Sequence, residues 1–571
     1  MSDAQKEYKN WLDNADDETK TELLRLNAAE IQDRFYRTLE FGTGGLRGVI
    51  GAGLNRINKY IVGQATQGLA NQLAKSGGDL THRGVAVAYD SRNMSPEFAK
   101  EAAAVLAANG IKVYLFENLR PTPELSFAVR YLNCASGIVI TASHNPAKYN
   151  GYKVYGADGS QITPETANII SSEINETDIF GGVKHKDFET AKSLGNIEII
   201  GESVDKAYID CVKEQSVNPR LAAEKGGDYT LVYTPLHGSG NLPVRRVLDE
   251  TGFKNVIAVP EQELPDGNCP TVKSPNPEEK EGFAIAIKYA EKYGADLIIA
   301  TDPDGDRAGI AIRDADGKYA AMTGNQVGVL LTEYIASQGI KHGNLPQNGV
   351  IVKTIVTTDM VRGICKKYGL ELAEILTGFK FIGEKIMEFE QAGDKQFVFG
   401  FEESYGYLKG TYARDKDAVA ASMLIAEMAL YYKTQGLTLY EQMQNLYNEY
   451  GYYAEDLISV AMEGAEGPEK IKKIMENLRA IPPTEIGGMK VTAVRDYKTS
   501  RRQDIISGEI RNIFLPKSDV LYFELENGSN FIARPSGTEP KIKFYLMCRG
   551  ESEAAAENTL EKIKEWTDRI L

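Results

Sequence analysis

Three aspartates alternate along one short segment of this sequence: DPDGDR (302–307) contains Asp302, Asp304 and Asp306. Largely apolar runs on both sides, 296–300 and 308–312, predict two buried strands joined by this loop. In an extended loop, a period of two would turn all three carboxylates to one side. Three oxygen ligands without His or Cys favour Mg²⁺, because carboxylates this crowded repel one another unless a cation intervenes. The alternative is a solvated acidic turn.

A serine and a histidine stand side by side in a second polar loop, TASHNP (141–146), which follows the apolar run 137–140. Ser143 does not lie in the G-x-S-x-G turn of serine hydrolases, which disfavours that chemistry. Alone, Ser143 and His144 are more typical of a turn in which serine caps a helix. A serine hydroxyl is a poor nucleophile unless a base or a metal activates it, so the aspartate loop makes Ser143 a catalytic candidate.

Three further loops carry groups suited to phosphate or sugar. The glycines of FGTGGLRG (41–48) would bring backbone N–H groups to an oxyanion, and Arg47 offers a guanidinium. The loop RPSGTEPK (534–541) is built like a phosphate cradle, with the candidate ligands Arg534, Ser536, Gly537 and Thr538. The segment GFEESYGY (400–407) presents sugar-binding candidates Glu402, Glu403 and Ser404. Ordinary turns are the alternative for each loop.

The elements that must position these loops repeat along the chain. An apolar strand, a polar loop, a helix ended by glycine and a second strand recur from Val85, Thr230 and Val350. This order predicts right-handed crossovers in parallel sheets, with ligand-binding loops at the carboxyl ends of the strands. We therefore expect three similar mixed α/β domains, and their predicted limits are 1–206, 207–315 and 316–450.

The repeated strand-helix-strand pattern ends near residue 450. A probable hairpin turns at Asn527-Gly528, and an amphipathic helix follows from Glu551. We expect a smaller α+β domain with an antiparallel sheet at 451–571.

Composition limits the functions that the chain could have. Its 571 residues contain 65 Lys plus Arg against 80 Asp plus Glu, and the net charge of −15 disfavours nucleic acid as a partner. The charged N-terminus does not resemble a signal peptide, and no apolar run has the length of a membrane span, so we expect a cytoplasmic protein. Five scattered cysteines without a CxxC pair indicate neither a disulfide framework nor a zinc site.

Together these motifs resemble the α-D-phosphohexomutase superfamily, in that family's order and across nearly the whole chain. The resemblance implies that TASHNP carries a phosphorylated Ser143, which would join the three aspartates as a ligand of Mg²⁺. It also implies sugar contacts from FEES, with Arg307 among the substrate-binding residues, and a phosphate site in RPSGTEPK. The implied fold is three α/β domains and a TATA-binding-protein-like fourth domain around one deep cleft.

The implied reaction interconverts glucose 1-phosphate and glucose 6-phosphate. Phosphoserine would donate its phosphoryl group to the sugar, giving bound glucose 1,6-bisphosphate, which turns over and returns its other phosphate to Ser143. Glucose 1,6-bisphosphate is also the implied activator. Lys153 and Lys380, and next His144, are the candidate general acids and bases, with Arg47 as a further catalytic candidate.

Several alternatives stay open at this point. FEES is most like the glucose branch, but the run YARDKD (412–417) also resembles the branch with phosphopentomutase and glucose-1,6-bisphosphate synthase, and phosphomannomutase is a further alternative. A metal-dependent sugar phosphatase also uses a DxD loop, although Asp306 occupies a position where that class has Thr or Val. A sensor that binds a sugar phosphate without catalysis is a third class. The only expected partner is a small phosphosugar, and we expect a monomer or dimer.

Overall fold

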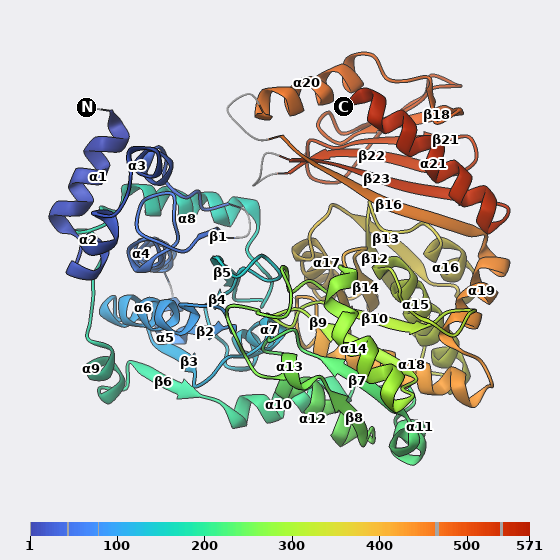
Figure 1. The fold of residues 1–571 in the computed structure, drawn as a ribbon, viewed down its shortest axis with the longest axis horizontal. Helices are drawn as coiled ribbons and strands as arrows, with labels where there is room; N and C mark the ends of the chain where they lie inside the picture. The colour runs from blue at the N-terminus through green and yellow to red at the C-terminus, as the bar shows by residue number, and fades with distance from the viewer. Residues whose placement is uncertain (1, 43–44, 78, 463–466, 537–540) are drawn as a thin grey trace.

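Four β-sheets follow one another along the chain in the computed structural model, which describes residues 2–42, 45–77, 79–462, 467–536 and 541–571. In Figure 1 they follow one another around the molecule, with the fourth sheet above the third on the right and the N-terminal helices on the left. The first three sheets are mixed and the fourth is antiparallel, so the predicted fold class is confirmed.

The first sheet has the order β1-β5-β4-β2-β3-β6. Its strands are β1 (Leu46–Val49), β2 (Val85–Tyr89), β3 (Val113–Phe116), β4 (Ser136–Ile140), β5 (Tyr149–Gly156) and β6 (Ile197–Ile200). Helices α4 (Lys59–Lys75), α6 (Ser95–Ala108) and α8 (Pro164–Glu176) pack together beside it. The N-terminal helices α1 (Asp3–Asn14), α2 (Asp17–Leu23) and α3 (Ala28–Phe35) are attached to this domain through a cluster of aromatic rings around the buried Trp11.

The second and third sheets repeat the plan with fewer strands. The second, ordered β11-β10-β9-β7-β8, contains β7 (Thr230–Thr234), β8 (Asn255–Ala258), β9 (Leu297–Thr301), β10 (Ala308–Arg313) and β11 (Tyr319–Ala321). The third, ordered β13-β12-β14-β15, contains β12 (Gly349–Thr354), β13 (Glu371–Ile375), β14 (Gln396–Phe401) and β15 (Tyr407–Lys409).

The three predicted strand-helix-strand units are present. Helices α6, α12 (Asn241–Thr251) and α16 (Val361–Tyr368) each connect two parallel strands. Glycine ends these helices because the chain turns there with positive φ, at 118° in Gly252 and 69° in Gly369, a region that a Cβ disfavours.

The fourth sheet has the order β16-β23-β22-β21-β18-β19-β20, and β17 pairs with β18. Its strands are β16 (Tyr452–Ala461), β17 (Glu485–Ile486), β18 (Met489–Asp496), β19 (Arg501–Asp504), β20 (Ile510–Asn512), β21 (Leu521–Leu525), β22 (Asn530–Pro535) and β23 (Lys541–Gly550). Helices α20 (Gly467–Ala480) and α21 (Glu553–Ile570) pack against it. The predicted hairpin joins β21 to β22, with Gly528 at φ 80°.

Apolar packing makes the first three domains one body. A continuous core runs through all three, and the buried helix α18 (Ala418–Thr434) contacts α10 (Glu202–Lys213), α12 and α15 (Gly324–His342). Two predicted domain limits lie within or next to shared elements of this body, and the domain limits stay predictions. The limit at 206/207 lies inside α10, and the second sheet continues past residue 315 because β11 pairs with β10.

The fourth domain packs on the third through a smaller apolar cluster. It brings Ile355 and Leu376 against Tyr522 and Tyr545. This contact fixes the face of the fourth sheet that meets the loop after β14.

Candidate active site

Three of the predicted loops connect a strand to its antiparallel neighbour. The loop with Ser143 joins β4 to β5, the aspartate loop joins β9 to β10, and the loop with Glu402 joins β14 to β15. In each case the first strand of the hairpin also pairs with a parallel strand of its sheet. Each loop therefore leaves the carboxyl end of a strand, as predicted.

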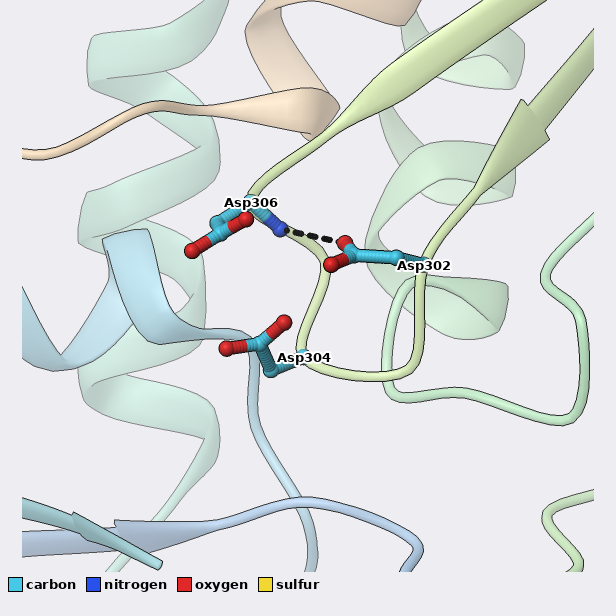
Figure 2. Close-up of side chains that lie close together, drawn as sticks. All are labelled: Asp302, Asp304 and Asp306. Atoms are coloured by element: carbon cyan, nitrogen blue, oxygen red, sulfur yellow. Dashed lines mark hydrogen bonds between the residues drawn. The ribbon is translucent and has the colours of Figure 1, made fainter. Parts of the chain in front are cut away.

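The three aspartates converge, as Figure 2 shows, and one carboxylate oxygen of each lies within 4.8 Å of the others. The predicted extended conformation is wrong: the loop is a tight turn, with Gly305 at φ 62° and its N–H donating to the carbonyl of Asp302. All three side chains are buried, and one oxygen each of Asp304 and Asp306 has no hydrogen-bond donor among the described residues. Buried carboxylate oxygens without donors fit a divalent cation.

Two lysines compensate part of this negative charge. The Lys153 amine lies 2.8 Å from Asp304 and 3.7 Å from Asp306, and the Lys416 amine lies 3.1 Å from Asp306. Burial and the two neighbouring carboxylates raise the pKa of Asp302 well above its usual value. Burial opposes a charged lysine, but Asp304 and Asp306 raise the pKa of Lys153 above its usual value. Lys153 is consequently held as a cation beside the aspartates.

Ser143 lies directly against the aspartate loop. Its hydroxyl donates to Asp302 Oδ2 at 2.9 Å, and its Oγ lies 3.1 Å from His144 Nδ1. Its φ of 53° is unusual for a residue with a Cβ. The surroundings hold this conformation, because the Ser143 N–H donates to the Thr141 hydroxyl at 2.8 Å and the buried Arg92 guanidinium binds the Ser143 carbonyl.

His144 is placed to exchange a proton with this hydroxyl. Burial, together with the positive charges of Arg307 and Arg47, lowers the pKa of His144 well below its usual value. The imidazole is therefore neutral at pH 7 and can accept a hydrogen bond through Nδ1. Arg47 itself is exposed on β1, where it donates to the Asn145 side chain at 3.1 Å, beside the Ser143 loop.

The loop after β14 lies on the other side of Arg307. Arg307 pairs with Glu278, and its backbone bridges to Gly406. Glu402 accepts a hydrogen bond from the Gly378 N–H at 2.9 Å, and burial raises its pKa to about 7. The half-buried Glu403 accepts from the hydroxyls of Thr354 and Thr357, at 3.4 and 3.2 Å. Ser404 lies in the same turn.

Lys380 begins helix α17 (Lys380–Ala392), two residues after the Gly378 N–H that binds Glu402. Burial, with a contribution from the charge of Arg534, lowers the pKa of Lys380 to about 8. Lys380 and Lys153 thus have opposite electrostatic environments, and only Lys380 has a substantial neutral fraction near pH 7.

The fourth domain contributes cations at the same boundary. Arg534 stands opposite Lys543 in the β22–β23 register, and its guanidinium lies 3.4 Å from the Tyr545 hydroxyl. Burial, and then the charge of Arg534, lower the pKa of Lys543, although Glu403 and Glu278 act in the opposite direction. The Ser536 N–H donates to the Lys541 carbonyl at 2.8 Å. The predicted ligands Gly537 and Thr538 lie outside the described residues.

The structure adds residues that the sequence reasoning missed. Lys416, Arg92 and Lys543 all contact or face predicted site residues. Lys416 lies in the YARDKD run, and Arg92 follows the strand β2, so the position after a strand was the available signal. For Lys543 the signal was the alternation of lysines in KIK, which places it on the Arg534 face.

Family models match the three domains that contain the loops with Ser143, the aspartates and Glu402. Models of the phosphoglucomutase/phosphomannomutase α/β/α domains I, II and III match residues 38–179, 206–317 and 323–450. The chain belongs to this family.

The chain is similar to known proteins over almost its whole length. It is 37% identical over 541 residues to the phosphoglucomutase of Staphylococcus epidermidis, with 94% of this chain and 96% of that protein covered. For the phosphoglucomutase of Staphylococcus haemolyticus the identity is 38%, with 94% and 95% covered.

Two solved structures show the same fold. The putative phosphomannomutase from Thermus thermophilus has a TM-score of 0.67 at 22% identity, with 93% of this chain and 99% of that chain covered. The open form of the parafusin phosphoglucomutase from Paramecium also has a TM-score of 0.67, at 18% identity, with 93% and 95% covered.

Among the described residues, no helix combines the length and the apolar character needed to cross a membrane.

Proposed function

We propose that this protein is a phosphoglucomutase, which interconverts glucose 1-phosphate and glucose 6-phosphate through a phosphorylated Ser143. The carrying observation is the 2.9 Å hydrogen bond from the Ser143 hydroxyl to Asp302, within a buried cluster of three carboxylates. Full-length relatives named phosphoglucomutase support the choice of glucose.

The residues that would hold a metal are Asp302, Asp304 and Asp306, with an oxygen of the Ser143 phosphoryl group as a further ligand. We propose Mg²⁺, because the ligand set contains only oxygen atoms and leaves room for phosphate. When bound, the ion would offset negative charge as the phosphoryl group leaves the serine.

Phosphoryl transfer to the sugar requires a base, and we assign this role to Lys380. Its amine has a substantial neutral fraction, and it adjoins the segment that binds Glu402. When Ser143 is phosphorylated again, its hydroxyl proton has two acceptors within reach, Asp302 Oδ2 at 2.9 Å and the neutral His144 Nδ1 at 3.1 Å. Lys153 stays charged beside the aspartates, so it orients them and adds positive charge near the phosphoryl group.

The sugar would bind between the loop after β14 and the fourth sheet. The carboxylates of Glu402 and Glu403 can accept hydrogen bonds from sugar hydroxyls, and the Ser404 hydroxyl can donate or accept them. Arg534, Lys543 and Ser536, with Gly537 and Thr538, would bind the phosphate that is not being transferred. Such a site must accept either end of glucose 1,6-bisphosphate, which we propose as both the intermediate and the activator. Arg307 and Arg47 complete the positive charge around the Ser143 loop.

The test is to trap the phosphoenzyme. Incubation with labelled glucose 1,6-bisphosphate and Mg²⁺ should give an acid-stable phosphoserine on the parent and none on Ser143→Ala, while replacement of the exposed Ser193 by alanine serves as the control. A label that hydroxylamine removes would instead indicate an aspartyl phosphatase, because acyl phosphates are labile to it. Mutase assays with the 1-phosphates of glucose, mannose and ribose then decide the sugar. A cytoplasmic location and a monomeric or dimeric state stay predictions.

A further inference from the structure

A second cavity lies at the far end of β14 from the proposed active site. It has a volume of about 410 Å³, within the range of about 300–1,000 Å³ that small-molecule sites occupy. It is bounded by the segment 215–217, the end of α15, the helix α17, the start of β14 and the end of β15. Its lining includes β14 as far as Val398, so the last three residues of the strand, 399–401, separate it from Glu402, a distance of roughly 13 Å along the strand.

The cavity combines apolar walls with a few charged groups. Val217, Ile335, Leu345, Phe389 and Phe397 line it with aliphatic and aromatic surface. A ligand with an apolar or aromatic body would bury that surface, which is the main source of affinity in such sites.

Two of the three charged side chains in the lining are already paired. Lys395 forms an ion pair with Glu371 at 2.6 Å, and Glu390 pairs with Arg414. The third, Lys409, ends β15, and its amine has no hydrogen bond or ion pair among the residues that the structure describes.

Glu427, whose charge acts on Lys409, already accepts hydrogen bonds from other donors. Glu427 accepts hydrogen bonds from the backbone N–H groups of Val217 at 2.8 Å and Asn218 at 3.0 Å, and from the hydroxyls of Tyr334 and Ser216. Burial lowers the pKa of Lys409 despite the charge of Glu427. The cavity therefore contains one cation that lacks a partner for its amine protons.

The neighbouring backbone fixes the position of this lysine. Gly410 follows it at φ 78°, and a Cβ there would come within 2.3 Å of Gln215 Oε1. The turn after β15 is thus packed against the 215–217 segment, and both segments line the cavity.

We propose that this cavity binds a small organic anion, in which one negatively charged group pairs with the Lys409 amine and an apolar body fills the space between Phe389, Phe397 and Val217. The Lys409 amine offers a contact for one anionic group, and Val217, Phe389 and Phe397 offer apolar surface to the rest of the ligand, while polar lining residues such as Gln215 and Asn344 flank them. The site is separate from the proposed catalytic centre.

The probes are a matched pair of fluorescent dyes, anilinonaphthalene sulfonate and the neutral N-phenylnaphthylamine, titrated into the full-length protein with Mg²⁺ and saturating glucose 1-phosphate. We expect saturable binding of the sulfonate, and weaker affinity by about tenfold or more in Lys409→Met, because a charge-assisted contact is lost. The neutral dye should bind Lys409→Met as it binds the parent. Lys395→Met is the control and should leave both affinities within about twofold.

Val217→Trp should weaken both dyes, because it fills the cavity. Circular dichroism and mutase turnover report whether each variant folds, and Lys409→Gln replaces Lys409→Met if the latter does not. The proposal is overturned if the parent does not bind the sulfonate, if Lys409 variants bind it as tightly as the parent, or if Val217→Trp leaves binding unchanged. A parallel titration without glucose 1-phosphate should give the same affinity, and much tighter binding there would also overturn the proposal, since the dye would then occupy the catalytic site.

Discussion

Replacement of Lys380 by methionine tests which lysine acts as the base. Burial and Arg534 lower the pKa of Lys380 from 10.5 to about 8, whereas Glu384 on the same helix acts in the opposite direction. At pH 7 about a tenth of such an amine is neutral, against about 3 in 10,000 for an unperturbed lysine. The environment therefore increases the neutral form about 300-fold.

A base acts in its neutral form, so the direction of the pH dependence follows. The rate of phosphoryl transfer from the phosphoenzyme to glucose 1-phosphate should rise about tenfold per pH unit below pH 8 and level off above it. Lys380→Met should lower this rate about 10²- to 10⁴-fold and remove the rise.

Single-turnover experiments measure this step directly. Phosphorylated enzyme is mixed with glucose 1-phosphate between pH 7 and 9, where the substrate phosphate with its pKa of about 6 is a dianion, and acid quenching gives the remaining phosphoserine. Lys385→Met is the matched control, because Lys385 lies on the same helix and pairs with Glu388. If Lys380→Met keeps the parent rate within about tenfold, or the same rise with pH, the assignment of Lys380 is wrong.

The remaining predictions concern the metal, the phosphate and the sugar loop. Mg²⁺ at about 100 times its Kd should raise the free energy of unfolding by about 2.7 kcal/mol, measured as an increase in Tm, and an equal increase in Asp304→Asn would contradict the metal assignment. Arg534→Ala should raise KM about tenfold or more, because a charged hydrogen-bond donor is lost. Replacement of the exposed Arg511 by alanine should leave KM unchanged. An unchanged KM of Arg534→Ala in steady-state assays would exclude Arg534 from substrate binding. Gly324→Ala should lower kcat/KM at least about tenfold with little change in helix content, since its Cβ would come within 2.1 Å of the Glu403 carbonyl oxygen. Gly227→Ala is the control, because a Cβ there meets nothing within 4 Å. Equal activity of both variants would refute this reasoning.

Local sequence patterns were sufficient to predict many of the helices and strands of this fold. The strand at Val85, the helix starting at Ser95 and the glycine stops at Gly252 and Gly369 follow from short-range rules on apolar periodicity, capping and backbone freedom. The positions of the loops follow as well, because a polar segment after a buried strand must lie at the edge of the sheet. Such rules do not contain the packing between domains, where α10 spans the predicted limit at 206/207 and β11 pairs with β10 beyond residue 315.

The sequence by itself determined which side chains could do chemistry: one serine, three alternating aspartates, and separate sugar and phosphate loops. Only the tertiary structure decided which of them meet and in which protonation state. Ser143 and Asp302 are 159 residues apart and touch at 2.9 Å, and Lys416 reaches Asp306 from a third domain. Lys153 and Lys380 are the same residue type, but two carboxylates hold the first as a cation, whereas burial beside Arg534 lowers the pKa of the second. Desolvation and charge at a site depend on distances across domains, which no local pattern of residues specifies.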